Sequence, residues 1–147
     1  MLKPTKILVP TDFSEYSDKA LKQAIDIAKQ YNAKVYLLHV IPAVQQCVMD
    51  YCVSQDMLEG LAKQARGWAT DSLQKQLEKF PQSKDVEVIT DIKEGVAYEE
   101  ILKEVEKAGI DLVVIASLGR SGIAKYLIGS VARNVLKGTK CPVLLTK

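Results

Sequence analysis

The stretch DLVVIASLGRSGIAKYLIGS, residues 111–130, determines both the fold and the candidate site. Its first part, DLVVI, is apolar and β-branched, which is typical of a buried strand. The strand leads into a turn that contains Gly119 and Gly122, and Gly129 and Ser130 then begin a short helix. A buried strand that is followed by bare backbone and a helix start predicts a strand–helix unit with room for a ligand.

The rest of the chain repeats this alternation of strand and helix. Apolar or alternating runs predict five strands, and apolar stripes at helical spacing predict four helices. The strands are expected at residues 5–10, 33–41, 85–90, 111–117 and 141–146, and the helices at about 14–31, 56–80, 97–108 and 130–136. Residues 43–55 have no clear period and are expected to form a loop or a flap. The sequence thus predicts a single α/β domain over residues 1–147, with an open, mostly parallel five-stranded sheet and helices on both faces.

Two side-chain environments follow from these elements. The helix at 56–80 is expected to bury the face that carries Leu58, Leu61, Ala65, Trp68, Ser72 and Leu77. His39, the only histidine, lies within an apolar strand. We expect it to be packed and hydrogen-bonded to backbone rather than catalytic.

Composition and charge narrow the classes of function. The chain has 20 Lys and Arg against 18 Asp and Glu, so nothing predicts nucleic acid or an anionic membrane as a partner. The apolar runs are too short to span a bilayer, and the N-terminus lacks a signal-peptide layout, so a cytoplasmic protein is expected. The three cysteines, Cys47, Cys52 and Cys141, indicate ordinary thiols rather than a disulfide framework or a zinc site.

Three turns follow the carboxyl ends of predicted strands, at residues 11–12, 41–42 and 118–119. In open parallel sheets, ligands bind beyond the carboxyl ends of the strands, where the strand order reverses. We therefore expect these turns to meet at one site.

The glycine-rich stretch has the chemistry of a phosphate site. Gly119 and Gly122 offer bare backbone, Gly129 and Ser130 begin a helix, and Arg120 adds a positive charge. A P-loop is excluded because Ser130 stands where it requires Lys, and a dinucleotide fingerprint is excluded because PTD follows the first strand. On spacing alone, a glycine-rich turn that merely joins strand to helix is the open alternative.

Three segments carry a resemblance to a known family. KILVPTDFSEYSDKALKQAIDIAKQYNAKVYLLHVI (6–41), EGVAYEEILKEVEKAGIDLVVIASLGRSG (94–122) and LIGSVARNVLKGTKCPVLLTK (127–147) are similar to successive parts of a universal stress protein (UspA-like) domain. The resemblance covers the whole chain. It implies a Rossmann-like, adenine nucleotide alpha hydrolase-like fold.

ATP-binding members of that family share a pattern of Gly, two residues, Gly, nine residues, then Gly-Ser or Gly-Thr. Here the second glycine is Gly119, residues 120–128 follow, and Gly129 and Ser130 complete the pattern. The first position is Ala116, whose methyl group keeps the backbone N–H but can crowd a phosphate or ribose. Some relatives lack the pattern and do not bind ATP, so that alternative stays open.

The resemblance implies an adenine nucleotide, ATP or AMP, as the ligand. Asp12 would accept hydrogen bonds from adenine or ribose, and the alternative for it is an Asx turn or helix cap. The implied ligand-binding residues are Pro10, Thr11, Asp12, Val40, Ile115, Ala116, Gly119, Arg120, Gly122, Gly129, Ser130 and Val131. No carboxylate cluster predicts a dedicated metal site, so Mg²⁺ would arrive with ATP. No catalytic residue is predicted.

The last strand begins at Pro142 and ends at Thr146, and it is short and apolar. In the family the corresponding strand pairs antiparallel with its copy in a second chain. An apolar sheet edge needs a cover, so a homodimer is expected. The alternative is an edge strand packed within one monomer.

Three functions remain open at this point. One is a stress-response regulator that binds ATP or AMP and presents the result to an unknown protein partner. Another is a slow ATPase or self-phosphorylating protein, for which the sequence offers no convincing base. The third is a dimer that works by protein interaction without a nucleotide, for which Ala116 is the best argument.

Overall fold

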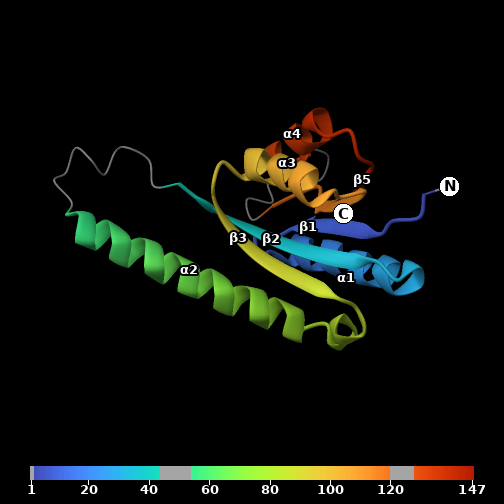
Figure 1. Cartoon of the computed structure of the whole chain (residues 1–147), viewed down its shortest axis with the longest axis horizontal. Helices are drawn as coiled ribbons and strands as arrows, with labels where there is room; N and C mark the ends of the chain where they lie inside the picture. Colours follow the sequence, from blue (N-terminus) through green and yellow to red (C-terminus); the bar gives the residue numbers. More distant parts are fainter. Residues whose placement is uncertain (1, 44–53, 120–127) are drawn as a thin grey trace.

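The computed structural model describes residues 2–43, 54–119 and 128–147. Figure 1 shows strands and helices that alternate along the chain. The elements are β1 (Lys6–Pro10), α1 (Glu15–Tyr31), β2 (Lys34–Pro42), α2 (Gln55–Glu78), the 3₁₀ helix η2 (Pro81–Asp85), β3 (Val88–Gly95), α3 (Ala97–Ala108), β4 (Leu112–Ala116), α4 (Ser130–Gly138) and β5 (Val143–Thr146). The strands form one sheet in the order β3-β2-β1-β4-β5, and every neighbouring pair is parallel. The predicted α/β fold is confirmed.

Helices cover both faces of this sheet. Successive side chains of a strand point to opposite faces, so a strand that is apolar throughout needs a helix on each face to bury them. Ile7 and Val9 of β1 pack in one core with α1 and with Leu73 of α2. Leu8 packs on the other face, in a second core with residues of α3 and α4. These three β1 residues are fully buried. Figure 1 shows the same division, with α3 and α4 on one side of the sheet and α1 and α2 on the other.

The ends of α1 follow from the local sequence. Ser14 is its N-cap, and the Ser14 side chain accepts a hydrogen bond from the Ser17 N–H. Glu15 and Asp18 lie in the first turn, where their charge is favoured by the helix dipole. Asn32 ends the helix in a left-handed conformation that its short polar side chain tolerates.

The third strand lies later in the chain than the sequence pattern predicted. Residues 81–85 form η2, and β3 pairs with β2 from Val88, opposite Val35, to Gly95, opposite Pro42. The predicted strand at 85–90 was therefore only partly right. Polar residues such as Asp91 and Glu94 interrupt the apolar pattern, so the sequence did not predict the second half of the strand. They are tolerated because β3 is at the edge of the sheet, where side chains reach water.

The predicted inner face of α2 was also partly wrong. Leu61 and Trp68 are about half exposed, whereas Ala69, Leu73 and Gln76 are the buried residues. The reason is visible in Figure 1, where the first half of α2 extends beyond the sheet. The loop or flap expected at 43–55 falls almost wholly on residues 44–53, outside the described part of the chain. Among the described helices, which include this long one, none is both long and apolar enough to cross a bilayer.

The strand order reverses on either side of β1, which pairs with β2 on one side and β4 on the other. The chain therefore leaves β1, β2 and β4 at the same edge of the sheet. The turns at residues 11–12 and 118–119 meet there as predicted. The turn predicted at residues 41–42 is wrong, because Ile41 and Pro42 pair with β3 as the last residues of β2.

Candidate functional site

A cavity of about 350 Å³ lies at the carboxyl ends of β1, β2 and β4. This volume is within the range of small-molecule sites. Ten of the residues expected from the sequence line it: Pro10, Thr11, Asp12, Val40, Ile115, Ala116, Gly119, Gly129, Ser130 and Val131. The other two, Arg120 and Gly122, lie outside the described residues. The predicted residues therefore share one cavity wherever the structure describes them.

Eight more residues line the cavity and were not among the ligand-binding residues implied by the resemblance, although Leu118 belongs to the predicted turn at 118–119. They are Ser17, Leu38, His39, Ala97, Ile101, Ser117, Leu118 and Ala132. Ala97 and Ile101 belong to the apolar stripe that predicted α3. Because α3 starts directly after the carboxyl end of β3, the topology itself could have placed its first turn at the cavity. Ser17 had no comparable signal, since it reaches the cavity only through the shape of the turn after β1.

That turn has an unusual backbone conformation. Phe13 has φ of 65°, in the left-handed region that costs a non-glycine residue roughly 1 kcal/mol. The Phe13 N–H donates to Thr11 Oγ1 over 3.1 Å, and the Ser14 N–H donates to Asp12 Oδ1 over 3.0 Å. Asp12 thus makes the Asx-type contact that was its alternative role, and it also lines the cavity.

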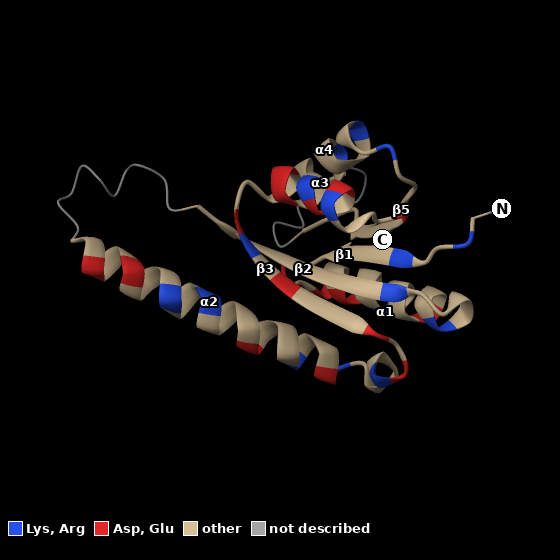
Figure 2. Ribbon diagram, in the orientation of Figure 1, with Lys and Arg blue, Asp and Glu red and all other residues tan. Residues whose placement is uncertain are grey.

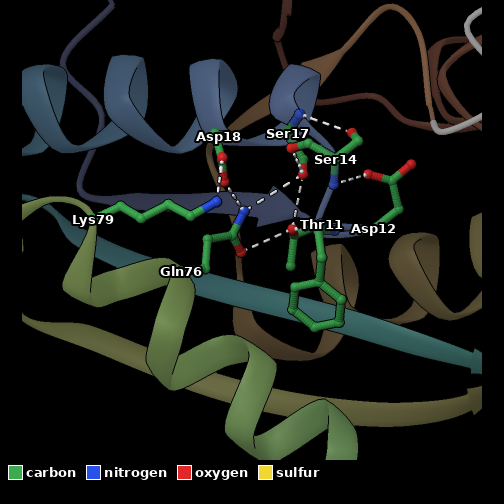
Figure 3. A network of polar contacts seen from close by, with 8 residues as sticks. Thr11, Asp12, Ser14, Ser17, Asp18, Gln76 and Lys79 are labelled. Atoms are coloured by element: carbon green, nitrogen blue, oxygen red, sulfur yellow. Dashed lines mark hydrogen bonds and ion pairs between the residues drawn. The ribbon is translucent and has the colours of Figure 1, made fainter.

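A buried polar network lies behind the turn (Figure 3). Thr11 Oγ1 lies 2.9 Å from Gln76 Oε1 of α2 and 3.0 Å from Ser17 Oγ of α1. The carbonyl oxygen of Thr11 lies 2.8 Å from Nδ1 of His39. The expectation of a packed histidine bonded to backbone is therefore confirmed. These contacts fix Thr11 from three neighbouring elements.

Gly119 and Gly129 lie where a side chain would meet the site. A Cβ on Gly119 would lie 2.8 Å from Asp12 Oδ2, and a Cβ on Gly129 would lie 3.3 Å from the Ser117 carbonyl oxygen. The Gly129 N–H donates to that same carbonyl over 2.6 Å. The amide of Gly129, which we expected to face a phosphate, is therefore used to close the turn.

The amides that remain for a ligand are those of the first turn of α4. Gly129 is the N-cap and provides no side-chain cap, so Ser130, Val131 and Ala132 keep unpaired N–H groups among the residues that the structure describes. All three residues line the cavity. A helix start of this kind favours a negative group.

Charge around the cavity is unevenly placed. Asp12 is the only acidic residue in the described lining, and Lys and Arg are absent from it. Figure 2 shows mixed charges on α2 and α3 but only basic residues, Arg133 and Lys137, on α4. In the described lining, the group that favours an anion is therefore the N-terminus of α4.

The described side chains whose pKa is shifted, Lys93, Lys103 and Asp111, do not line the cavity. A hydrogen bond with Asp91, together with its charge, raises the pKa of Lys93, and a hydrogen bond with Glu100 raises the pKa of Lys103. For Asp111, burial acts to raise the pKa, but hydrogen bonds from Thr5 and Lys6 outweigh it and lower the pKa. Within the described ranges, His, Cys, Asp and Glu form no group of three that could hold a metal ion.

The arrangement combines three chemical features within one cavity. Val40 and Ile115 give apolar walls, Asp12 gives a carboxylate acceptor, and α4 gives amide donors to which no described residue is hydrogen-bonded. These features suit a ligand with a flat or apolar part, hydrogen-bond donors and an anionic end.

Comparisons with known proteins agree on one family. The sequence model of the Universal stress protein family matches residues 4–147. Universal stress protein MJ0531 of Methanocaldococcus jannaschii is 35% identical over 142 residues, which cover 97% of this chain and 81% of that protein. The structure of universal stress protein UspA from Lactobacillus plantarum superposes with a TM-score of 0.82 at 20% identity, over 100% of both chains.

Two further solved structures carry nucleotides. A universal stress protein in complex with cAMP superposes with a TM-score of 0.69 at 21% identity, over 99% of this chain and 98% of that one. The universal stress protein from Archaeoglobus fulgidus in complex with dAMP has a TM-score of 0.60 at 19% identity, over 99% of this chain and 100% of that one. At these identities the likeness concerns the fold. The family-model match over nearly the whole chain and the 35% identity to MJ0531 establish that this chain belongs to the universal stress protein family.

Proposed function

We propose that the protein binds an adenine nucleotide, ATP or AMP, in the cavity at the carboxyl ends of β1, β2 and β4. The observation that carries the proposal is the free N-terminus of α4, which opens into a cavity with apolar walls and one carboxylate. The purine would lie between Val40 and Ile115, and Asp12 would accept from an adenine or ribose donor. The phosphates would bind the amides of Ser130, Val131 and Ala132.

The family supports the choice of ligand. Relatives of the same fold have been solved with cAMP and with dAMP, which share an adenine base and a phosphate. The same base and the same anionic group fit the two ends of the cavity. Arg120 and Gly122 complete the proposed site, although they lie outside the described residues.

We propose a regulatory rather than a catalytic role for the bound nucleotide. Hydrolysis needs an oriented water and charge stabilisation at the γ-phosphate. In the described lining, Asp12 is the only carboxylate, and its Oδ1 already accepts the Ser14 N–H. We expect nucleotide turnover no faster than in buffer, and a change in the protein surface on binding that a partner protein reads.

We also propose a homodimer through β5. β5 is at the edge of the sheet, and its Leu144 is 37% exposed. The Val113 N–H donates to the Pro142 carbonyl, and the Ser117 N–H donates to the Thr146 carbonyl. Because main-chain groups alternate along a strand, those of Val143 and Leu145 face the open edge, where a second copy can pair with them.

The nucleotide proposal is tested on purified protein. Denaturation should release a species that absorbs at 260 nm, and chromatography against standards identifies it as ATP or AMP. Calorimetry on stripped protein then measures ATP and AMP binding, and a phosphate-release assay measures turnover. Binding without turnover supports the regulator. Turnover above buffer would instead support the ATPase, and no binding at about 1 mM ATP would contradict the proposal.

A further inference from the structure

Gln76 of α2 is a buried amide that contacts the turn after β1. Its side chain is 2% exposed, although α2 contributes no residue to the cavity lining. Its Oε1 accepts from Thr11 Oγ1 over 2.9 Å, and its Nε2 donates to Asp18 Oδ1 over 2.8 Å. A buried amide is costly unless both ends are paired, and here each end has a partner on a different element. Figure 3 shows Gln76 reaching from α2 toward Thr11 and Ser17.

The hydrogen-bond partners of Gln76 are Thr11, Ser17 and Asp18, and each of them lines the cavity or supports its wall. Thr11 and Ser17 line the cavity, and Thr11 Oγ1 also accepts the N–H of Phe13. Asp18 is held from the other side by Lys79, whose Nζ lies 2.8 Å from Asp18 Oδ2. Removing the Gln76 amide would therefore leave Ser17 Oγ as the remaining partner of the Thr11 hydroxyl, and would weaken the hold on the oxygen that accepts the N–H of the left-handed Phe13.

A second contact joins α2 to the same turn. The Trp68 ring meets the Phe13 ring edge-on, with centroids 5.3 Å apart, and the Phe13 ring lies 4.4 Å from the ring of His39. Such aromatic pairs contribute beyond their buried area. Trp68 and Gln76 thus contact the turn from α2 at two separate points, one aromatic and one polar.

We propose that Gln76 is a positioning residue of the cavity, which couples α2 to the turn that presents Asp12. The coupling to ligand rests on the proposed nucleotide function, but the coupling to the turn does not. Occupation of the cavity stabilises the turn, the turn stabilises the contacts of Gln76 and Trp68, and the position of α2 therefore responds to the ligand. Coupling of this kind is reciprocal. If the ligand favours one position of α2 by a given factor, then holding α2 in that position raises the affinity for the ligand by the same factor.

The test compares Gln76→Met with Gln74→Met in the full chain. Met has nearly the length of Gln, so Gln76→Met removes the amide while the volume stays filled. Gln74 is exposed on the same helix, so its variant makes the same chemical change away from the turn. Gln76→Glu keeps an acceptor for Thr11 and removes the donor to Asp18, and it serves with the same readouts if Gln76→Met does not fold.

Three readouts separate this proposal from the proposed function. Hydrogen exchange without nucleotide should be about tenfold faster at the Phe13 and Ser14 amides in Gln76→Met and unchanged in Gln74→Met. ATP affinity should fall about five- to tenfold in Gln76→Met alone. Trp68 is the only tryptophan, so its emission should change on ATP addition in the unmodified protein and change less in Gln76→Met.

The outcomes are distinct. Unchanged exchange at Phe13 and Ser14 in Gln76→Met would overturn the positioning role, whether or not ATP binds. Faster exchange with unaltered ATP affinity, or ATP binding with no change in Trp68 emission, would overturn the coupling to the cavity. If the unmodified protein does not bind ATP, the nucleotide proposal fails, while faster exchange would still support Gln76 as the residue that sets the turn.

Discussion

Gly119 lies so close to Asp12 that a Cβ on Gly119 would be 2.8 Å from Asp12 Oδ2. The other oxygen of that carboxylate is held by the Ser14 N–H. The glycine and the carboxylate come from turns more than a hundred residues apart in the chain, after β4 and β1. Their contact fixes where the acceptor of the proposed nucleotide site stands.

Gly119→Ala should therefore weaken ATP binding by about tenfold or more, because the added methyl group turns Asp12 out of place. Stability should fall by less than about 1 kcal/mol, since the atom it meets is the end of a side chain. Calorimetry and thermal unfolding measure the two effects. Gly67→Ala is the control, since its methyl group meets nothing within 4 Å. Equal affinity of Gly119→Ala and the unmodified protein would contradict this account of Asp12.

Ala116 departs from the family's ATP-binding pattern, and its methyl group packs against the core on the α1 side of the sheet. Ala116→Gly should cost roughly 0.5–1 kcal/mol of stability through strand entropy and lost packing. It should leave ATP affinity unchanged or lower it. Chemical unfolding measures the stability, and calorimetry measures the ATP affinity. Tighter ATP binding by Ala116→Gly would contradict the prediction and show that the methyl group crowds the ligand.

Asp111 ties the start of β1 to the start of β4. Its carboxylate accepts from Thr5 Oγ1 over 2.6 Å, from the Thr5 N–H and from the Lys6 N–H. Burial acts to raise the pKa of Asp111, but these hydrogen bonds bring the pKa below its usual value. A lowered folded-state pKa means that the stabilisation is complete above the unfolded pKa of about 4 and is lost as pH falls through the folded pKa.

Asp111→Asn should thus lower stability at pH 7, by no more than about 1 kcal/mol because solvent screens this partly exposed carboxylate, and the difference should shrink below about pH 4. Urea unfolding at several pH values measures it. Asp26→Asn is the control, because Asp26 forms a half-exposed ion pair with Lys22 that contributes little. A difference for Asp111→Asn that stays constant down to about pH 2 would show that the charge of Asp111 is irrelevant.

Leu144→Lys should convert the proposed dimer into a monomer. In an antiparallel pairing of two β5 strands, the two lysines would bring like charges close together at a sheet edge. Light scattering after size-exclusion chromatography measures the mass. Leu136→Lys on α4, at a leucine with similar exposure of 39%, should remain dimeric. A monomeric unmodified protein, or a dimeric Leu144→Lys variant, would place the interface elsewhere.

Much of the fold could be predicted because burial on two sides makes strand sequences continuous and apolar. Residues 6–10 and 112–116 are of this kind, and both strands are where the pattern put them. β3 was misplaced because an edge strand accepts polar residues such as Asp91. The inner face of α2 was misassigned because half of that helix extends past the sheet. Its apolar residues Leu61 and Trp68 are therefore about half exposed, although their spacing predicted that they would be buried.

The residues of the candidate site also fall into those that the sequence could predict and those that it could not. Residues at strand ends, such as Asp12 and Gly119, follow from topology and turn chemistry. Gln76 and Ser17 do not, because their roles depend on side-chain contacts between α2, α1 and the turn. A glutamine in a helical pattern looks like a solvent-exposed residue until the tertiary structure shows that it is buried.

The central claim is that α4 presents free amides to an anionic ligand, and Gly129→Asp tests it most directly. Asp is a favoured N-cap, so its carboxylate should bind the α4 amides itself while the fold is kept. Titration of stripped protein with ATP should show about one site per chain for the unmodified protein, weaker binding for Gly129→Ala, and no measurable binding for Gly129→Asp. ATP binding to a folded Gly129→Asp variant with undiminished affinity would contradict the claim.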